Sequence, residues 1–315
     1  MLAVLGALFA NGLITVLKFI GAVVTGSSGM MAESLHSLAD TTNQVFLLLG
    51  LRFYRRPASE KHPFGYGKER FFWSFIAAIF IFGVGATYAI YEGVNKLYHP
   101  HAPENLRWAY IILAASFLIE LGSIGLAIYQ EVKEAHHEGM SFTQYLRESK
   151  DPTAKTVLFE DTAALIGIVI AATGLYLTEH HAGPAGGAYW DGVASITIGL
   201  VLAVVAFALA RSSRGLLLGE AATKKSLEAI RGAILAHPNV CGVEELLTMH
   251  LAPKQILINA HVSFRDDLAT GDIERAINEI EQSIKRAEPM VDMIFMETAR
   301  RSEPDADEPI LQHIG

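Results

Sequence analysis

Six long apolar stretches, separated by short polar segments, fill the first two thirds of the chain. They cover residues 2–24, 30–53, 70–97, 106–130, 154–178 and 189–211. A helix needs about 20 mostly apolar residues to cross a membrane, so each stretch predicts one transmembrane helix. The first stretch is not expected to be a signal peptide, because it lacks a basic start and a small-residue cleavage site and is too long for one.

The rest of the chain follows different periodicities. Helical spacing covers residues 223–236 and 270–287, and strand-like segments cover 243–251, 255–264 and 290–298. In the central strand every second residue from Ile256 to Phe264 is apolar, while the intervening positions are largely polar. The order α-β-β-α-β predicts a small α+β domain with both helices on one face of a sheet.

Charge supports a division into two domains. Residues 1–212 carry 14 Lys and Arg and 16 Asp and Glu, whereas residues 213–315 carry 11 and 17. The net charge of −8 argues against a nucleic-acid-binding protein. The single cysteine excludes an intramolecular disulfide and a zinc finger built on cysteines. We therefore expect a membrane domain of six helices over 1–212 and an acidic α+β domain over 213–315.

The distribution of basic residues predicts the orientation in the membrane. Lys and Arg concentrate in the loop after the second helix, between the fourth and fifth helices, and after the sixth. The alternate loops, at 25–29, 98–105 and 179–188, contain none. Both termini and the α+β domain are therefore expected on the cytoplasmic side.

Two of the predicted helices carry ionisable residues at bilayer depth, where such groups need a partner or a cavity. The second helix contains Glu33, His36 and Asp40, and the fifth contains Glu160 and Asp161. His36 and Asp40 are four residues apart and share one helical face. An imidazole with carboxylates suits Zn²⁺ and its borderline neighbours. The alternative is a polar clamp between helices that binds no metal.

Other polar residues in the helices have simpler interpretations. Asn11 and Lys18 are expected to form hydrogen bonds or to reach towards the membrane surface. Glu120 is either protonated, paired with Lys18 or involved in transport. Asp191 is expected to cap its own helix, the sixth, where a carboxylate suits the helix dipole.

Three motifs together resemble the cation diffusion facilitator family. They are HPFGYGKER at 62–70, the run TGSSGMMAESLHSLAD leading into the second helix, and YWDGVASITIGL at the sixth. The stretches LHSLADTTNQ and FEDTAALIG are most similar to a zinc-transporter subgroup that includes a mitochondrial animal member. The resemblance covers nearly the whole chain and implies a homodimeric transporter that moves zinc or similar ions out of the cytoplasm in exchange for protons.

The resemblance also implies a metal site. His36 and Asp40 match the ligand pair of the second helix, and Asp161 matches the second ligand of the fifth. The family usually has a histidine as the first ligand of that helix. The matching position here is Val157, which cannot bind metal. Glu160, Glu33, Asn43 or water must fill the gap, and we favour Glu160, although adjacent helical residues point about 100° apart.

Two further metal sites of the family are matched only in part. The loop after the second helix offers Glu60 and His62 but has Tyr66 where a second histidine is usual. The α+β domain at 213–315, called the tail below, often binds zinc between subunits in the family. Its candidate ligands in this chain are His250, His261 and Glu297. Met296 stands where an aligned histidine is expected.

The sequence thus predicts an integral membrane protein of a bacterial inner (plasma) membrane that exchanges Zn²⁺ for protons by alternating access. Co²⁺, Fe²⁺, Mn²⁺, Ni²⁺ and Cd²⁺ fit the same donors. We expect the tail to hold the two subunits of a homodimer together. We do not expect the protein to bind nucleic acid. The alternatives are a metal-binding scaffold or sensor, and a membrane metalloenzyme with Glu160 as general base. No HExxH-type motif supports the enzyme.

Overall fold

The computed structural model describes residues 2–137, 139–148, 152–181 and 187–299. It divides into two compact units, Met1–Leu218 and Gly219–Gly315. The expected boundary lay at 212, and the difference arises because the last helix of the first unit continues to Leu218. The predicted fold class, a helical membrane domain followed by a small α+β domain, is confirmed.

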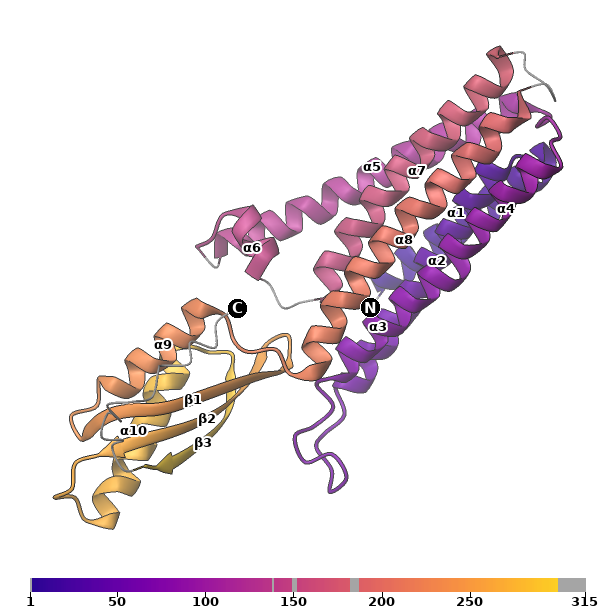
Figure 1. The fold of residues 1–315 in the computed structure, drawn as a ribbon. Helices are drawn as coiled ribbons and strands as arrows, with labels where there is room; N and C mark the ends of the chain where they lie inside the picture. The colour runs from indigo at the N-terminus through magenta and orange to yellow at the C-terminus, as the bar shows by residue number, and fades with distance from the viewer. Residues whose placement is uncertain (1, 138, 149–151, 182–186, 300–315) are drawn as a thin grey trace, which may run out of the picture. The chain divides into compact units, whose positions relative to one another are not determined.

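The first unit contains the six predicted helical segments, which run side by side in Figure 1. They are α1 (Leu2–Thr25), α2 (Ser28–Tyr54), a third segment made of α3 (Glu69–Phe80), the π-helix η1 (Ile81–Ala86) and α4 (Thr87–Tyr98), then α5 (Leu106–His137), α7 (Pro152–His180) and α8 (Ala188–Leu218). A short helix, α6 (Phe142–Glu148), lies in the polar connector before α7.

Four of these segments are long and apolar enough by themselves to cross a membrane. They are Glu69–Tyr98, Leu106–His137, Thr156–His180 and Ala188–Leu218, and Asn11–Thr25 is a shorter apolar helix. The 27-residue helix α2 does not meet this criterion, and its run of Ser, Glu, His, Asp, Asn and Gln explains its low hydropathy. The helix that falls short of this criterion is thus the one that carries Glu33, His36 and Asp40.

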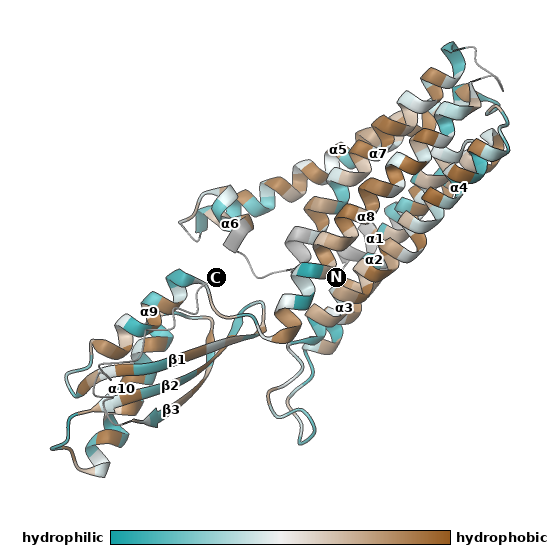
Figure 2. Cartoon of the chain, in the orientation of Figure 1, coloured by the Kyte–Doolittle hydropathy of each residue, from teal (hydrophilic) through white to brown (hydrophobic). Residues whose placement is uncertain are grey.

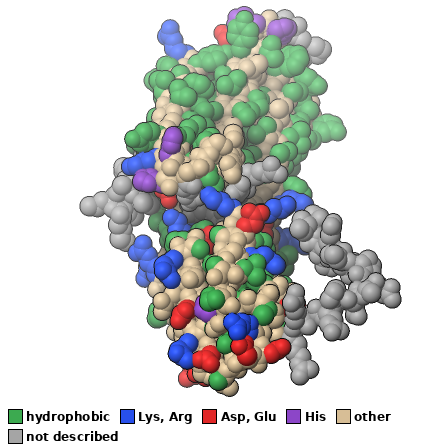
Figure 3. All heavy atoms as spheres, turned by 90° about the vertical axis from the view of Figure 1, so that its left-hand side faces the viewer, with side chains coloured by type: hydrophobic (Ala, Val, Ile, Leu, Met, Phe, Trp, Pro, Cys, Tyr) green, Lys and Arg blue, Asp and Glu red, His purple; other side chains and the backbone are tan. Residues whose placement is uncertain are grey.

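Hydrophobic side chains lie both inside and on the outer surface of this unit, as expected for helices in lipid. The core includes Met30 of α2, Leu113 of α5, Ile168 of α7 and Leu202 of α8. Large apolar side chains such as Phe207 remain 69% exposed. Figure 2 shows apolar residues along the helices of this unit, and Figure 3 shows apolar side chains over much of the visible face, with charged side chains more frequent on the second unit.

Glycines allow α4 and α8 to pack closely. A Cβ atom at Gly93 would lie 2.6 Å from the Gly192 carbonyl oxygen, and one at Gly199 would lie 2.6 Å from Ile90. The Ser195 hydroxyl also donates to the Ala89 carbonyl at 2.8 Å. Small residues and a serine hydrogen bond are the usual means of joining helices in lipid, so α4 and α8 form a firmly connected pair.

The second unit has the predicted α-β-β-α-β order. Its elements are α9 (Lys224–Leu235), β1 (Val240–Ala252), β2 (Gln255–Phe264), α10 (Thr270–Ala287) and β3 (Val291–Thr298). The central strand β2 pairs antiparallel with β1, for example Leu246 opposite Ala260, and parallel with β3, for example Ile258 opposite Ile294.

Both helices of this unit cover the same face of the sheet. Ile230 of α9 and Ile280 of α10 are buried in one cluster with Ile256, Ile258 and other alternate residues of β2. The alternation of β2 therefore has the expected physical cause, because its apolar face packs on the helices. The opposite face carries His261 and is more open to solvent.

Candidate metal centre

Helix α2 brings the first group of candidate ligands together on its buried side. Glu33 and His36 are 0% and 1% exposed. His36 Nε2 lies 3.4 Å from Asp40 Oδ2, as their four-residue spacing predicts. The contact lacks hydrogen-bond geometry, so both nitrogens of the His36 ring have no hydrogen-bond partner among the described residues.

Helix α7 supplies Glu160 and Asp161, which point to different neighbours. Both carboxylate oxygens of Glu160 accept hydrogen bonds from the Asn43 amide of α2, at 2.7 and 2.6 Å. Asp161 Oδ2 accepts one from the Ser123 hydroxyl of α5, at 2.8 Å. The side chains of Glu160 and Asp161 therefore point in different directions, as expected of adjacent helical residues. Both carboxylates nevertheless border one cavity.

This cavity is polar, has a volume of about 60 Å³ and lies between α1, α2, α5 and α7. Four carboxylates line it: Asp40 from α2, Glu120 from α5, and Glu160 and Asp161 from α7. Val157 lines it as well. A cavity of this size has room for a small ion or a few waters.

The candidate ligands border this cavity without forming a closed coordination shell. Within the described ranges, no three His, Cys, Asp or Glu side chains are arranged to hold one ion. Asp40, Glu160 and Asp161 line the cavity, whereas His36 reaches it only beside Asp40. The arrangement is that of an open site, in which side chains must close around an ion.

Glu33 has a different partner. Its Oε2 lies 3.2 Å from Lys18 Nζ, and both side chains are completely buried. The expectation that Lys18 forms a hydrogen bond is confirmed. The alternatives, that it reaches the membrane surface or pairs with Glu120, are wrong. Lys18 of α1 faces Glu33 of α2, and a buried charge is held by an opposite one. Glu33 is thus engaged by a lysine and does not line the cavity.

Close packing of α7 holds this ion pair in place and gives a prediction. A Cβ atom at Gly167 would collide with Glu33 Oε1, so the buried carboxylate would have to shift, which disturbs its contact with Lys18. We expect Gly167→Ala to lower the free energy of unfolding by about 1–3 kcal/mol, measured by denaturant unfolding in detergent. Gly122→Ala on α5, where no atom lies within 4 Å, is the control. Equal stability of the two variants would contradict the packing argument.

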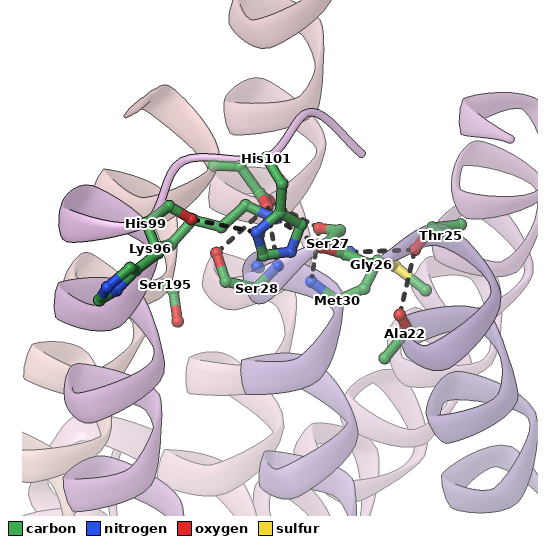
Figure 4. Close-up of polar contacts among 12 residues, drawn as sticks. Ala22, Thr25, Gly26, Ser27, Ser28, Met30, Lys96, His99, His101 and Ser195 are labelled. Carbon is green, nitrogen blue, oxygen red and sulfur yellow. Dashed lines mark hydrogen bonds and ion pairs between the residues drawn. The ribbon is translucent and has the colours of Figure 1, made fainter. Parts of the chain in front are cut away.

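Asp191 forms a second buried network at the start of α2. Figure 4 shows Ser27, Ser28 and Lys96, which belong to this network. Asp191 is 0% exposed, and its carboxylate accepts hydrogen bonds from the Ser27 hydroxyl at 2.6 Å and the Ser28 and Gly29 amides at 2.7 and 3.1 Å. The prediction that Asp191 caps its own helix is wrong in this respect, because its carboxylate binds the N-terminus of α2 instead.

Lys96, which the sequence analysis did not single out, completes this network. Its Nζ lies 3.5 Å from Asp191 Oδ2 and donates to the Gly26 carbonyl at 2.6 Å. Gly26 has a φ of 62°, a left-handed conformation that favours glycine. One buried ion pair thus ties α4 and α8 to the turn between α1 and α2. A lysine near the end of a helix gives no sequence signal for this role.

The loop candidates remain exposed and separate. The rings of His62 and Tyr66 are in contact, with centroids 4.5 Å apart and planes tilted by 37°. Glu60 and His62 are exposed. The aromatic ring of Tyr66 therefore takes the place beside His62 that a second histidine would need for metal binding.

The tail candidates are divided between two places. His261 lies between two carboxylates, with Nδ1 3.3 Å from Glu245 Oε2 and Nε2 3.5 Å from Glu297 Oε2. His250 is buried near the other end of β1, with Nδ1 3.4 Å from the Ala252 carbonyl oxygen. The structure therefore brings His261 and Glu297 together, adds Glu245, and leaves His250 apart.

Comparison with known proteins decides the family. Residues 4–218 match the cation efflux transmembrane domain, and residues 222–295 match the cytoplasmic domain of cation efflux proteins. The chain belongs to the cation efflux family. This confirms the resemblance carried by the three motifs. Members of the family are transporters, so the expectation that the chain is not an enzyme is also confirmed.

Several curated proteins are similar over much of the chain. The human mitochondrial proton-coupled zinc antiporter SLC30A9 is 31% identical over 99% of this chain and 57% of its own length. Metal tolerance protein C4 of Arabidopsis thaliana is 35% identical over 84% of this chain and 57% of its own length. The cation-efflux pump FieF of Klebsiella pneumoniae is 23% identical over 86% of this chain and 83% of its own length. The chain thus spans little more than half the length of the first two relatives.

Proposed function

We propose that the chain exports divalent metal ions, Zn²⁺ foremost, in exchange for protons. The observation that carries this proposal is the cavity inside the apolar helical unit, lined by four carboxylates from α2, α5 and α7. Ionisable groups at bilayer depth are costly and mark ion or proton pathways. The name of the human relative, a proton-coupled zinc antiporter, supports the same activity.

We propose His36, Asp40, Asp161 and Glu160 as the ligands of the transported ion. When the cavity is open to the cytoplasm, their unprotonated forms take the ion, and two or three carboxylates neutralise its charge. His36 lies against Asp40, and both its ring nitrogens are available to bind the ion. When the cavity opens to the other side, protons compete for the same atoms and release the metal.

Glu160 enters this set in place of the missing ligand at Val157, and both residues line the cavity. Because Asn43 occupies both Glu160 oxygens, the carboxylate must exchange those hydrogen bonds for the metal. Glu33, held by Lys18, is not part of the set that we propose.

The donors do not restrict the ion to zinc. One imidazole with several carboxylates also accepts Co²⁺, Fe²⁺, Mn²⁺, Ni²⁺ or Cd²⁺. Zn²⁺ is placed first because the human and frog relatives are named zinc antiporters.

We propose a homodimer in an energised membrane, with the tail on the cytoplasmic side or its mitochondrial equivalent. The tail matches the family's cytoplasmic domain. Relatives named as mitochondrial match more of the chain than the bacterial pumps do, so a mitochondrial membrane stands beside the bacterial inner membrane as the location. Within the tail, His261 and Glu297 are the metal ligands that we propose, without His250, while Glu245 lies against the other ring nitrogen of His261.

Metal uptake into proteoliposomes with an acidic lumen tests the proposed function. We expect Zn²⁺ uptake that depends on the pH gradient. Glu160→Gln should lower it by about tenfold or more, because a neutral amide no longer balances the charge of the ion. Folded protein that transports none of the six metals, yet binds Zn²⁺, would contradict export and favour the metal-binding scaffold.

A further inference from the structure

Helix α5 contributes a carboxylate to the cavity that the proposed ligand set does not use. Glu120 lines the cavity together with Asp40 and Asp161. Lys18, the partner considered for it in the sequence, is occupied by Glu33. Glu120 therefore faces other carboxylates in the cavity, and such a group needs a cation or a proton for charge balance.

Two buried oxygens in the same cavity independently indicate a ligand. Ser37 and Asn43 are 5% and 1% exposed, and both line the cavity. Ser37 Oγ and Asn43 Oδ1 have no hydrogen-bond partner in the part of the chain that the structure describes. A buried polar atom without a partner costs about 1–3 kcal/mol. Oxygens of this kind around a small cavity suit a bound cation or its water.

The position of Glu120 on α5 fits a role beside Asp161. Ser123, three residues further along the same helix, donates its hydroxyl to Asp161. Residues three apart lie on one helical face, so Glu120 and Ser123 both face α7. Val157 of α7 also lines the cavity, and its apolar side chain offers no donor atom.

We propose that the Glu120 carboxylate binds the transported ion together with Asp40 and Asp161, and so adds a donor from α5 to the ligand set. This inference rests on the proposed function and adds a ligand to it. An extra carboxylate makes the donor set richer in oxygen. Oxygen ligands suit Mn²⁺, whereas an imidazole suits Zn²⁺. Replacing the carboxylate by an imidazole should therefore shift the preference of the site from Mn²⁺ towards Zn²⁺.

The test compares Glu120→Gln with a double variant, Glu120→Gln with Val157→His. We expect Glu120→Gln to reduce Zn²⁺ and Mn²⁺ uptake by at least about tenfold, because the ion keeps one more uncompensated charge. The double variant should regain most Zn²⁺ uptake but little Mn²⁺ uptake, since a histidine then offers nitrogen in the same cavity. Glu131→Gln, on the same helix and absent from the cavity lining, is the matched control and should transport normally.

A binding measurement keeps the test decisive if Glu120→Gln folds poorly. Glu120→Asp retains the charge but shortens the side chain, which withdraws its carboxylate from the ion. The visible absorption of Co²⁺ added to this variant in detergent reports the number and type of ligands. We expect its spectrum to differ from that of the original chain, and the spectrum of Glu131→Gln to be unchanged. Normal uptake by Glu120→Gln, or an unaltered Co²⁺ spectrum in Glu120→Asp, would overturn the inference and leave the transporter intact. If the original chain transports none of the metals, the proposed function itself is overturned.

Discussion

Asp161→Asn is expected to abolish metal transport while leaving the fold intact. The amide is nearly the same size and still accepts a hydrogen bond from Ser123, but it no longer neutralises the ion. One uncompensated charge at the centre of a bilayer costs about 2.5–3.5 kcal/mol, which corresponds to a loss of roughly 100-fold or more. Asp40→Asn, on the facing helix α2, should have an effect of similar size.

Initial rates of Zn²⁺ uptake into proteoliposomes provide the measurement for these variants. Glu92→Gln is the matched control, because Glu92 lies on α4 and does not line the cavity. Ser123→Ala, which removes only the hydrogen bond to Asp161, should cause a smaller loss. Asp161→Asn with a normal uptake rate would show that the ion does not pass through this cavity.

Asp191→Ala is expected to cause the largest loss of stability. It leaves the Lys96 ammonium without its opposite charge. It also leaves the Ser27 hydroxyl and the Ser28 and Gly29 amides without their acceptor at the start of α2. Removing one partner of a buried ion pair typically costs about 3–5 kcal/mol. We expect a decrease of this size in the free energy of unfolding, measured by denaturation in detergent.

Two comparisons show whether the loss of stability comes from this network or from removing a carboxylate in general. Glu179→Ala removes an exposed carboxylate near the end of α7 and should change stability little. Combining Asp191→Asn with Lys96→Met removes both charges and should recover part of the loss seen in Asp191→Ala. Unchanged stability of Asp191→Ala would contradict the structural role of the pair.

The helices and strands were predictable from the sequence, because hydrophobic periodicity reflects local packing. The tail strand 255–264 coincides with β2. Helix α5 extends to His137, beyond the predicted end at 130, because its last residues are hydrophilic but still form helix. The π-helix at Ile81–Ala86 was not predicted, since such a local change depends on packing against neighbours.

The candidate site was predictable only in part, and for a physical reason. Carboxylates within apolar helices are conspicuous in a sequence, so Asp40, Glu160 and Asp161 were identified as site candidates. Their partners depend on contacts between distant segments. Asn43 and Glu160 are 117 residues apart, and Ser28 and Asp191 are 163 apart. No local pattern indicates such pairs, which explains why Lys18 and Asp191 were assigned to the wrong partners.

Coupled movement of metal and protons tests the central claim most directly. Purified protein in proteoliposomes is given external Zn²⁺, while a pH-sensitive dye inside the vesicles reports lumenal protons. The account predicts that the lumen becomes more alkaline as Zn²⁺ enters, and that Asp40→Asn and Asp161→Asn abolish both signals. Zn²⁺ entry without any change in lumenal pH, or proton movement that persists in both variants, would contradict proton-coupled export through this cavity.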